Sequence, residues 1–227
     1  MRVYSPPRTK TRMRTIQLLY AQRETVNQDI LNIAFEESID SKAIDQLKQS
    51  LEHLGQDVAF HETPKKGPQA SILLLGISSV AILFGGAFVK KLGDKAAEDT
   101  YPHIKNALSK LYLKYFGEDP EYKVSILTTS ENKEPDTKYS LILALYCVGK
   151  DNQRAKFLYE TSWSKEQFEM ATDIYIRAMT EFVTNNQSEV KELIDASGSR
   201  MEPHLIAWSP SVGKLVRISA LPSHVRK

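Results

Sequence analysis

Residues 30–61 show two strand-like runs with a helical pattern between them. Residues 30–35 (ILNIAF) are mostly apolar and predict a strand that ends at a polar turn. Ser41 can cap a helix that Gly55 ends, as capping residues and C-terminal glycines commonly do. Its apolar positions recur every three or four residues: Ile44, Leu47, Leu51 and Leu54. With a second strand at residues 57–61 (DVAFH), the pattern predicts a small β-α-β unit with parallel strands.

The second half of the chain predicts a helix followed by three strands. The helix runs from Pro102 to Gly117, with one apolar face made of Ile104, Ala107, Leu108, Leu111 and Tyr112. The strand-like runs are residues 122–129, 139–148 and 154–161, and polar loops separate them, which is typical of an antiparallel meander. The middle run is almost entirely apolar, so we expect it to be central.

The C-terminal third predicts two helices and a hairpin. Ser164 and Gln167 have the spacing of a capping box. The long helix that follows carries apolar residues at helical spacing: Phe168, Ala171, Tyr175, Ala178 and Phe182. A short helix at 190–194 and a hairpin of residues 204–208 and 214–219 complete the chain.

These elements, with a further strand-like run at 14–21, define an α+β fold class. We expect a mixed sheet that combines the N-terminal β-α-β unit with the antiparallel three-strand meander and packs against helices. We divide the chain into a basic N-terminal arm (1–13), one α+β domain (14–202) and a basic C-terminal hairpin or tail (203–227). No linker is long enough to divide the central domain.

An unusual segment, residues 70–89, has no charged side chain over twenty positions. As a helix it would be about 30 Å long, which matches the hydrocarbon core of a bilayer. We therefore predict a long helix over residues 70–98, whose all-apolar part, residues 70–89, is a transmembrane candidate. Small residues that would form one packing stripe on it are Ser78, Ala81 and Gly85. Lysines that could anchor to lipid headgroups flank the segment: Lys65, Lys66, Lys90 and Lys91.

Two alternatives stand beside a permanent membrane span. A helix that is apolar on every side also suits the centre of a soluble multilayer fold. A permanent span would place residues 13–62 and 122–227 on opposite sides of the membrane, and the first part has too few strands to form a core alone. The third interpretation is a helix that is packed in a soluble form and inserts into a bilayer on activation.

Composition and charge restrict the functional classes. The 41% hydrophobic and 26% charged fractions are those of a folded protein, and the single Cys147 excludes an internal disulfide. No secretory signal is visible, so we expect a cytoplasmic protein associated with membranes. Residues 1–14 carry a net charge of +5 and residues 203–227 carry +4, which leaves −7 for the remainder, given the overall +2. Basic ends suggest contact with an anionic surface.

Known catalytic motifs are missing from the sequence. The five histidines lack the spacing of a metal site: His53, His61, His103, His204 and His224. Gly85-Gly86 lies inside the apolar run and is not interpreted as a phosphate loop. We therefore predict no catalytic residue, no cofactor and no metal ligand. The one weak pattern is Glu121 with Lys123, which would need a further carboxylate from Glu36, Glu37 or Asp40 to hold a catalytic metal.

The leading hypothesis is a non-enzymatic intracellular protein that engages a membrane through residues 70–89 as a conditional effector. Its expected partner is an anionic lipid surface or another protein, including a second copy of the chain. Nucleic acid is a less favoured partner, because the body of the chain is acidic. The alternative hypothesis is a soluble interaction or scaffold module with the apolar helix buried in its core. A metal-dependent nuclease is the third.

Overall fold

A computed structural model describes residues 30–64, 78–93, 100–122, 138–185, 187–199 and 201–219. Seven strands form one mixed sheet in the order β2-β1-β3-β4-β5-β6-β7. The strands are β1 (Leu31–Glu36), β2 (Val58–Thr63), β3 (Val80–Phe84), β4 (Tyr139–Val148), β5 (Arg154–Glu160), β6 (His204–Ser209) and β7 (Lys214–Ile218). The predicted α+β class with a mixed sheet is therefore confirmed.

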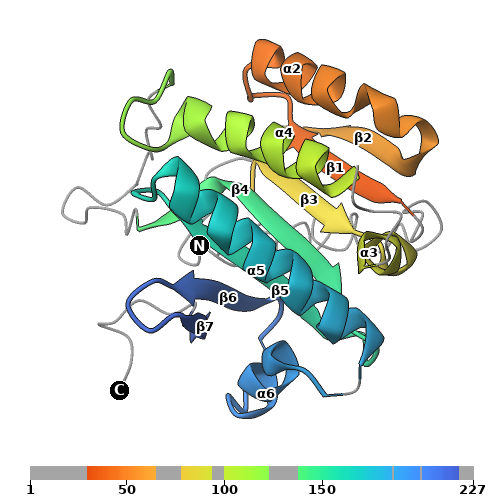
Figure 1. Cartoon of the computed structure of the whole chain (residues 1–227), viewed down its shortest axis with the longest axis vertical. Coiled ribbons are helices and arrows are strands. Elements are labelled where there is room, and N and C mark those ends of the chain that lie inside the picture. The colour runs from red at the N-terminus through yellow and green to blue at the C-terminus, as the bar shows by residue number, and fades with distance from the viewer. Residues whose placement is uncertain are drawn as a thin grey trace, which may run out of the picture.

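Helices cover one face of this sheet. They are α2 (Ser41–Leu51), the 3-10 helix η1 (Glu52–Asp57), α3 (Gly86–Gly93), α4 (Thr100–Tyr115), α5 (Lys165–Thr184) and α6 (Glu189–Asp195). Figure 1 shows α2, α4 and α5 side by side in front of the strands, with α6 beside β6 and β7. The main hydrophobic core lies between these helices and the sheet. A smaller buried cluster occupies the opposite face of the sheet, and its described members all come from strands.

The N-terminal β-α-β unit has the predicted form. β1 and β2 are parallel, with Leu31 opposite Val58, and α2 connects them. The helix cap differs from the prediction, because the carboxylate of Asp40, not Ser41, accepts the backbone N–H of Ala43 at 3.0 Å. The chain then turns through η1, where Gly55 has a φ of +52° that favours glycine.

The prediction of one apolar helix over residues 70–89 is wrong for the part that the structure describes. Val80–Phe84 form strand β3, and a short helix, α3, begins at Gly86 and ends at Gly93. Residues 70–77 and 94–98 lie outside the described residues. A strand with both faces buried reads as a continuous apolar run, which periodicity alone does not distinguish from a buried helix.

β3 occupies an interior position in the sheet. It pairs with β1 in antiparallel orientation and with β4 in parallel orientation. Val80, Ile82 and Phe84 face the helices and are at most 2% exposed, while Ala81 belongs to the opposite face. Across the described ranges, none of the helices has both the length and the hydropathy needed to cross a bilayer.

The C-terminal half follows the sequence pattern closely. β4 and β5 are antiparallel, with an irregularity between Tyr139 and Ala144, and β6 and β7 form the predicted hairpin. The capping box is present in both directions, since Ser164 accepts from the Gln167 backbone and the Gln167 side chain accepts from the Ser164 backbone. The predicted strand at 14–21 lies outside the described residues, and so does the predicted strand at 122–129 except for Tyr122, which is not in a strand.

The hydroxyl of Tyr175 joins α5 to two strands. It donates to the carbonyl of Leu158 at 2.6 Å and accepts the backbone N–H of Trp208 at 2.8 Å. Tyr175 is fully buried, so these two bonds satisfy backbone groups that water cannot reach. Burial also raises the pKa of Tyr175 well above its ordinary value, which keeps the hydroxyl protonated and able to donate.

We expect Tyr175→Phe to lower the free energy of unfolding by about 1–3 kcal/mol, because it leaves two buried backbone groups without a partner. Urea denaturation at neutral pH measures this change. Tyr101→Phe is the control, since its hydroxyl binds the exposed carboxylate of Asp173 and should contribute less. Equal losses in the two variants would contradict the role assigned to Tyr175.

Candidate functional site

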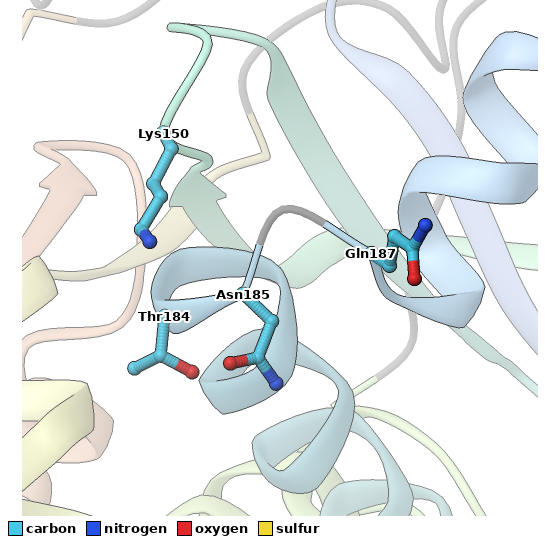
Figure 2. A pocket seen from close by; sticks show the side chains of 4 residues that line it. All are labelled: Lys150, Thr184, Asn185 and Gln187. Atoms are coloured by element: carbon cyan, nitrogen blue, oxygen red, sulfur yellow. The ribbon is translucent and has the colours of Figure 1, made fainter.

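A pocket of about 480 Å³ lies where the β4–β5 turn meets the end of α5. Its lining side chains are Lys150, Thr184, Asn185 and Gln187. In Figure 2, Lys150 extends from the turn toward the last residues of α5, where Thr184 and Asn185 lie, and Gln187 sits on the segment that leads to α6. The volume is within the range of small-molecule sites.

The turn that carries Lys150 is closed by its own backbone and packed on α5. The N–H of Gly149 donates to Gln153 at 2.9 Å, and the N–H of Asn152 donates back to Gly149 at 3.0 Å. A Cβ on Gly149 would lie 2.6 Å from the ring of Phe182, so a glycine is needed for this close approach. These contacts fix the base of Lys150 against the end of the helix.

The last turn of α5 supplies the other wall. Thr184 donates its hydroxyl proton to the carbonyl of Thr180 at 2.6 Å, so toward a bound molecule its oxygen can act only as an acceptor. The backbone N–H of Asn185 donates to Glu181 and ends the helix. The side-chain amides of Asn185 and Gln187 can each donate and accept hydrogen bonds with a bound molecule.

The charges around the pocket leave one lysine without a carboxylate. Asp151, next to Lys150, is paired with Lys191 at 2.9 Å, and Lys191 also contacts Asp195 at 3.4 Å. The hydrogen bond that Lys191 donates to Asp151 raises the pKa of Lys191, so this ammonium stays charged between the two carboxylates. Lys150 forms no ion pair with any residue that the structure describes. Lys150 is therefore the one charged side chain among the four that line the pocket.

The start of α3 lies beside the same end of α5. A Cβ on Gly86 would lie 3.4 Å from Val183, and the two helices pack together. Because β3 and β4 are parallel, their carboxyl ends share one edge of the sheet, and α3 begins at that edge. Unpaired N–H groups at a helix start carry a partial positive charge. Gly85-Gly86 is thus a strand-to-helix junction, and the prediction that it lies inside one long helix is wrong.

The predicted packing residues do not form one stripe. Ser78 precedes β3, Ala81 is in its middle, and Gly85 follows it. All three are buried, and the N–H of Ser78 donates to the hydroxyl of Tyr146 at 3.0 Å. They therefore pack within the sheet region, not along a helix. Their role as packing contacts of a membrane helix stays a prediction, and none of the three lies in a helix of the structure.

The predicted headgroup anchors are only partly described. Lys90 and Lys91 are exposed near the end of α3. Lys91 forms an ion pair with Asp57 at 3.3 Å, which attaches α3 to the end of η1. Lys65 and Lys66 lie outside the described residues. Anchoring to lipid stays a prediction for all four.

The structure brings the acids of the nuclease hypothesis only partly together. Tyr122 donates to the carboxylate of Asp40 at 2.8 Å, and this bond lowers the pKa of Asp40. The neighbouring Glu121 pairs with Lys114 at 3.5 Å, and Lys123 lies outside the described residues. Within the described ranges, no three His, Cys, Asp or Glu side chains are close enough to form a metal site.

A lysine buried in β5, Lys156, has no signal in the sequence pattern. Lys156 has no exposed surface, and its ammonium lies 5.5 Å from the ring centre of Tyr146 on the neighbouring strand. Burial removes water from the charged form and lowers the pKa of Lys156 to about 7. The residue sits on the face of the sheet opposite the helices, beside Leu158 and Leu205 in the strand pairing. The alternation of polar and apolar residues over 154–161 predicted only a peripheral strand.

Comparisons of this chain with protein-family models, with curated proteins and with solved structures found no significant match. The functional argument therefore depends on the geometry of the described residues.

We expect the free energy of unfolding to rise between about pH 7 and pH 9 because of Lys156. Its folded pKa is below the unfolded value, so over this range the unfolded chain binds a proton that the folded chain does not. The slope is at most about 1.4 kcal/mol per pH unit. Lys156→Met should remove this rise, and Lys90→Met, at an exposed position, should keep it. Urea denaturation at several pH values tests this, and parallel curves for wild type and Lys156→Met would contradict it.

Proposed function

We propose that this chain is a binding module for a small anionic molecule, one that carries a phosphate or carboxylate group. The observation that carries the proposal is the pocket in which Lys150 lacks a carboxylate partner among the described residues, while its neighbour Asp151 is paired with Lys191. A cation held at a pocket without a counter-ion favours a negatively charged ligand.

The remaining lining groups fit the same ligand class. The amides of Asn185 and Gln187 offer donors to anionic oxygens, and the Thr184 oxygen accepts from hydroxyl or amine groups elsewhere on the molecule. The start of α3 adds a partial positive charge at the same edge of the sheet. Ligands of open α/β sheets commonly bind beyond the carboxyl ends of parallel strands, as this pocket lies beyond β4.

The membrane hypothesis has weaker support than this proposal. Insertion of residues 70–89 into a bilayer would require β3 to leave the interior of the sheet. That would break its pairing with β1 and with β4 and would expose the buried Ile82 and Phe84. Burial of apolar strand residues contributes about 1.5–3 kcal/mol for each large side chain, so the release would be costly. Because β3 is held inside the sheet by β1 and β4, it suits the alternative hypothesis of an interaction module, of which ligand binding is one form.

Titration calorimetry with inorganic phosphate, citrate and ADP tests the proposal. We expect at least one of these anions to bind, and Lys150→Gln to weaken that binding about tenfold by removing the ammonium (~1.4 kcal/mol). Lys165→Gln is the matched control, because Lys165 is exposed at the opposite end of α5 and pairs with Glu169. No binding of any anion, or equal binding by Lys150→Gln, would contradict the proposal.

A sedimentation assay with anionic phospholipid vesicles distinguishes the two hypotheses. The ligand-binding proposal expects the chain to stay in the supernatant, or to bind vesicles only through Lys150 and the phosphate headgroups. Sedimentation that is unchanged in Lys150→Gln and survives a high-salt wash would instead support the membrane hypothesis, since burial of apolar residues in lipid is not screened by salt.

A further inference from the structure

Two histidines that are fifty positions apart in the sequence meet on the surface. His53 is in η1 and His103 is in the first turn of α4, and their ring centres lie 4.4 Å apart with the planes at 54°. Both side chains are exposed, so solvent and ions can reach the rings. A neutral imidazole nitrogen is the commonest metal ligand in proteins.

We propose that His53 and His103 together bind a divalent transition-metal ion, with water completing its coordination. The inference is independent of the anion pocket. Water is required because no third His, Cys, Asp or Glu joins the pair in the part of the chain that the structure describes. Histidine χ2 torsions are broad, so each exposed ring can turn one nitrogen toward a shared ion.

The ring spacing indicates which ions fit. With metal–nitrogen bonds of about 2.0–2.1 Å, each ring centre would lie roughly 3.2 Å from the ion. Centres 4.4 Å apart then subtend an angle of roughly 90° at the ion, whereas tetrahedral coordination needs centres roughly 5 Å apart. Adjacent positions at about 90° belong to octahedral and tetragonal ions, which favours Ni²⁺ and Cu²⁺ over Zn²⁺.

The ion would connect two parts of the helical layer. η1 follows α2 and belongs to the N-terminal β-α-β unit, whereas α4 leads into the strands of the second half. α2 and α4 already pack together, so a metal at His53 and His103 would hold a contact that exists without it. An ion that binds only the folded chain raises its melting temperature in proportion to the logarithm of the ion concentration.

The test uses the untagged full chain with Ni²⁺, Zn²⁺ and Mg²⁺. Thermal unfolding should shift upward with Ni²⁺, less with Zn²⁺ and not with Mg²⁺, which prefers oxygen ligands. Calorimetry should show that His53→Ala and His103→Ala each weaken Ni²⁺ binding at least tenfold. Circular dichroism checks that the variants are folded, as expected for exposed positions.

Two other histidines serve as controls. His61→Ala changes a histidine of the same β-α-β unit that contacts Asn32 at 3.1 Å, and His224→Ala changes one outside the described residues. Both variants should bind Ni²⁺ as the wild type does. Electron paramagnetic resonance of the Cu²⁺ form should show coupling to two imidazole nitrogens, and to fewer in either single variant at the pair.

Three results would overturn the proposal. One is a wild-type chain that does not respond to Ni²⁺. Another is Ni²⁺ binding that survives unchanged in His53→Ala or His103→Ala. The third is binding that is lost in His61→Ala or His224→Ala, which would place the ion elsewhere.

Discussion

The pairing of β3 with both of its neighbours is the constraint on which the rest of this structure depends. β2 and β1 come from the N-terminal unit, β4 to β7 come from the second half, and β3 is the strand between them. Without β3, two strands and one helix would have to form a core alone, which is marginal in water. The apolar character of residues 80–84 follows from this position, because an interior strand is covered by strands on both edges and by core on both faces.

The same strand determines where the candidate site lies. β3 runs parallel to β4, so the start of α3 and the β4–β5 turn meet at one edge of the sheet. α5 crosses the sheet and ends at that edge, where Phe182 packs on Gly149 and Val183 lies beside Gly86. Lys150 is thereby placed beside the end of α5, more than thirty residues away in the sequence. Its position is a consequence of sheet topology, not of a local motif.

Local patterns predicted the helices well where one face is buried and the other is exposed to solvent, and turn residues predicted the hairpin. The buried positions of α4 and α5, the capping box at Ser164 and the hairpin at β6 and β7 were all readable from spacing. The interior strand β3 was not, because it lies in an uncharged run of twenty residues that is long enough for a helix, whereas the apolar run of β4 spans only ten residues. The site residues were also hidden, because Lys150, Asn185 and the His53–His103 pair meet only in space. Gly85-Gly86 was the one local sequence signal at this edge of the sheet. The prediction of a helix over this segment hid the fact that a strand ends and a new helix begins there.

Amide hydrogen exchange of β3, in the presence and absence of anionic vesicles, tests the central claim most directly. If β3 holds the two halves of the sheet together, its amides should exchange only through global unfolding, at the same rate as those of β4 and with no effect of vesicles. Exchange in β3 that is much faster than in β4, or that accelerates when vesicles are added, would mean that the apolar strand leaves the sheet and would contradict this account.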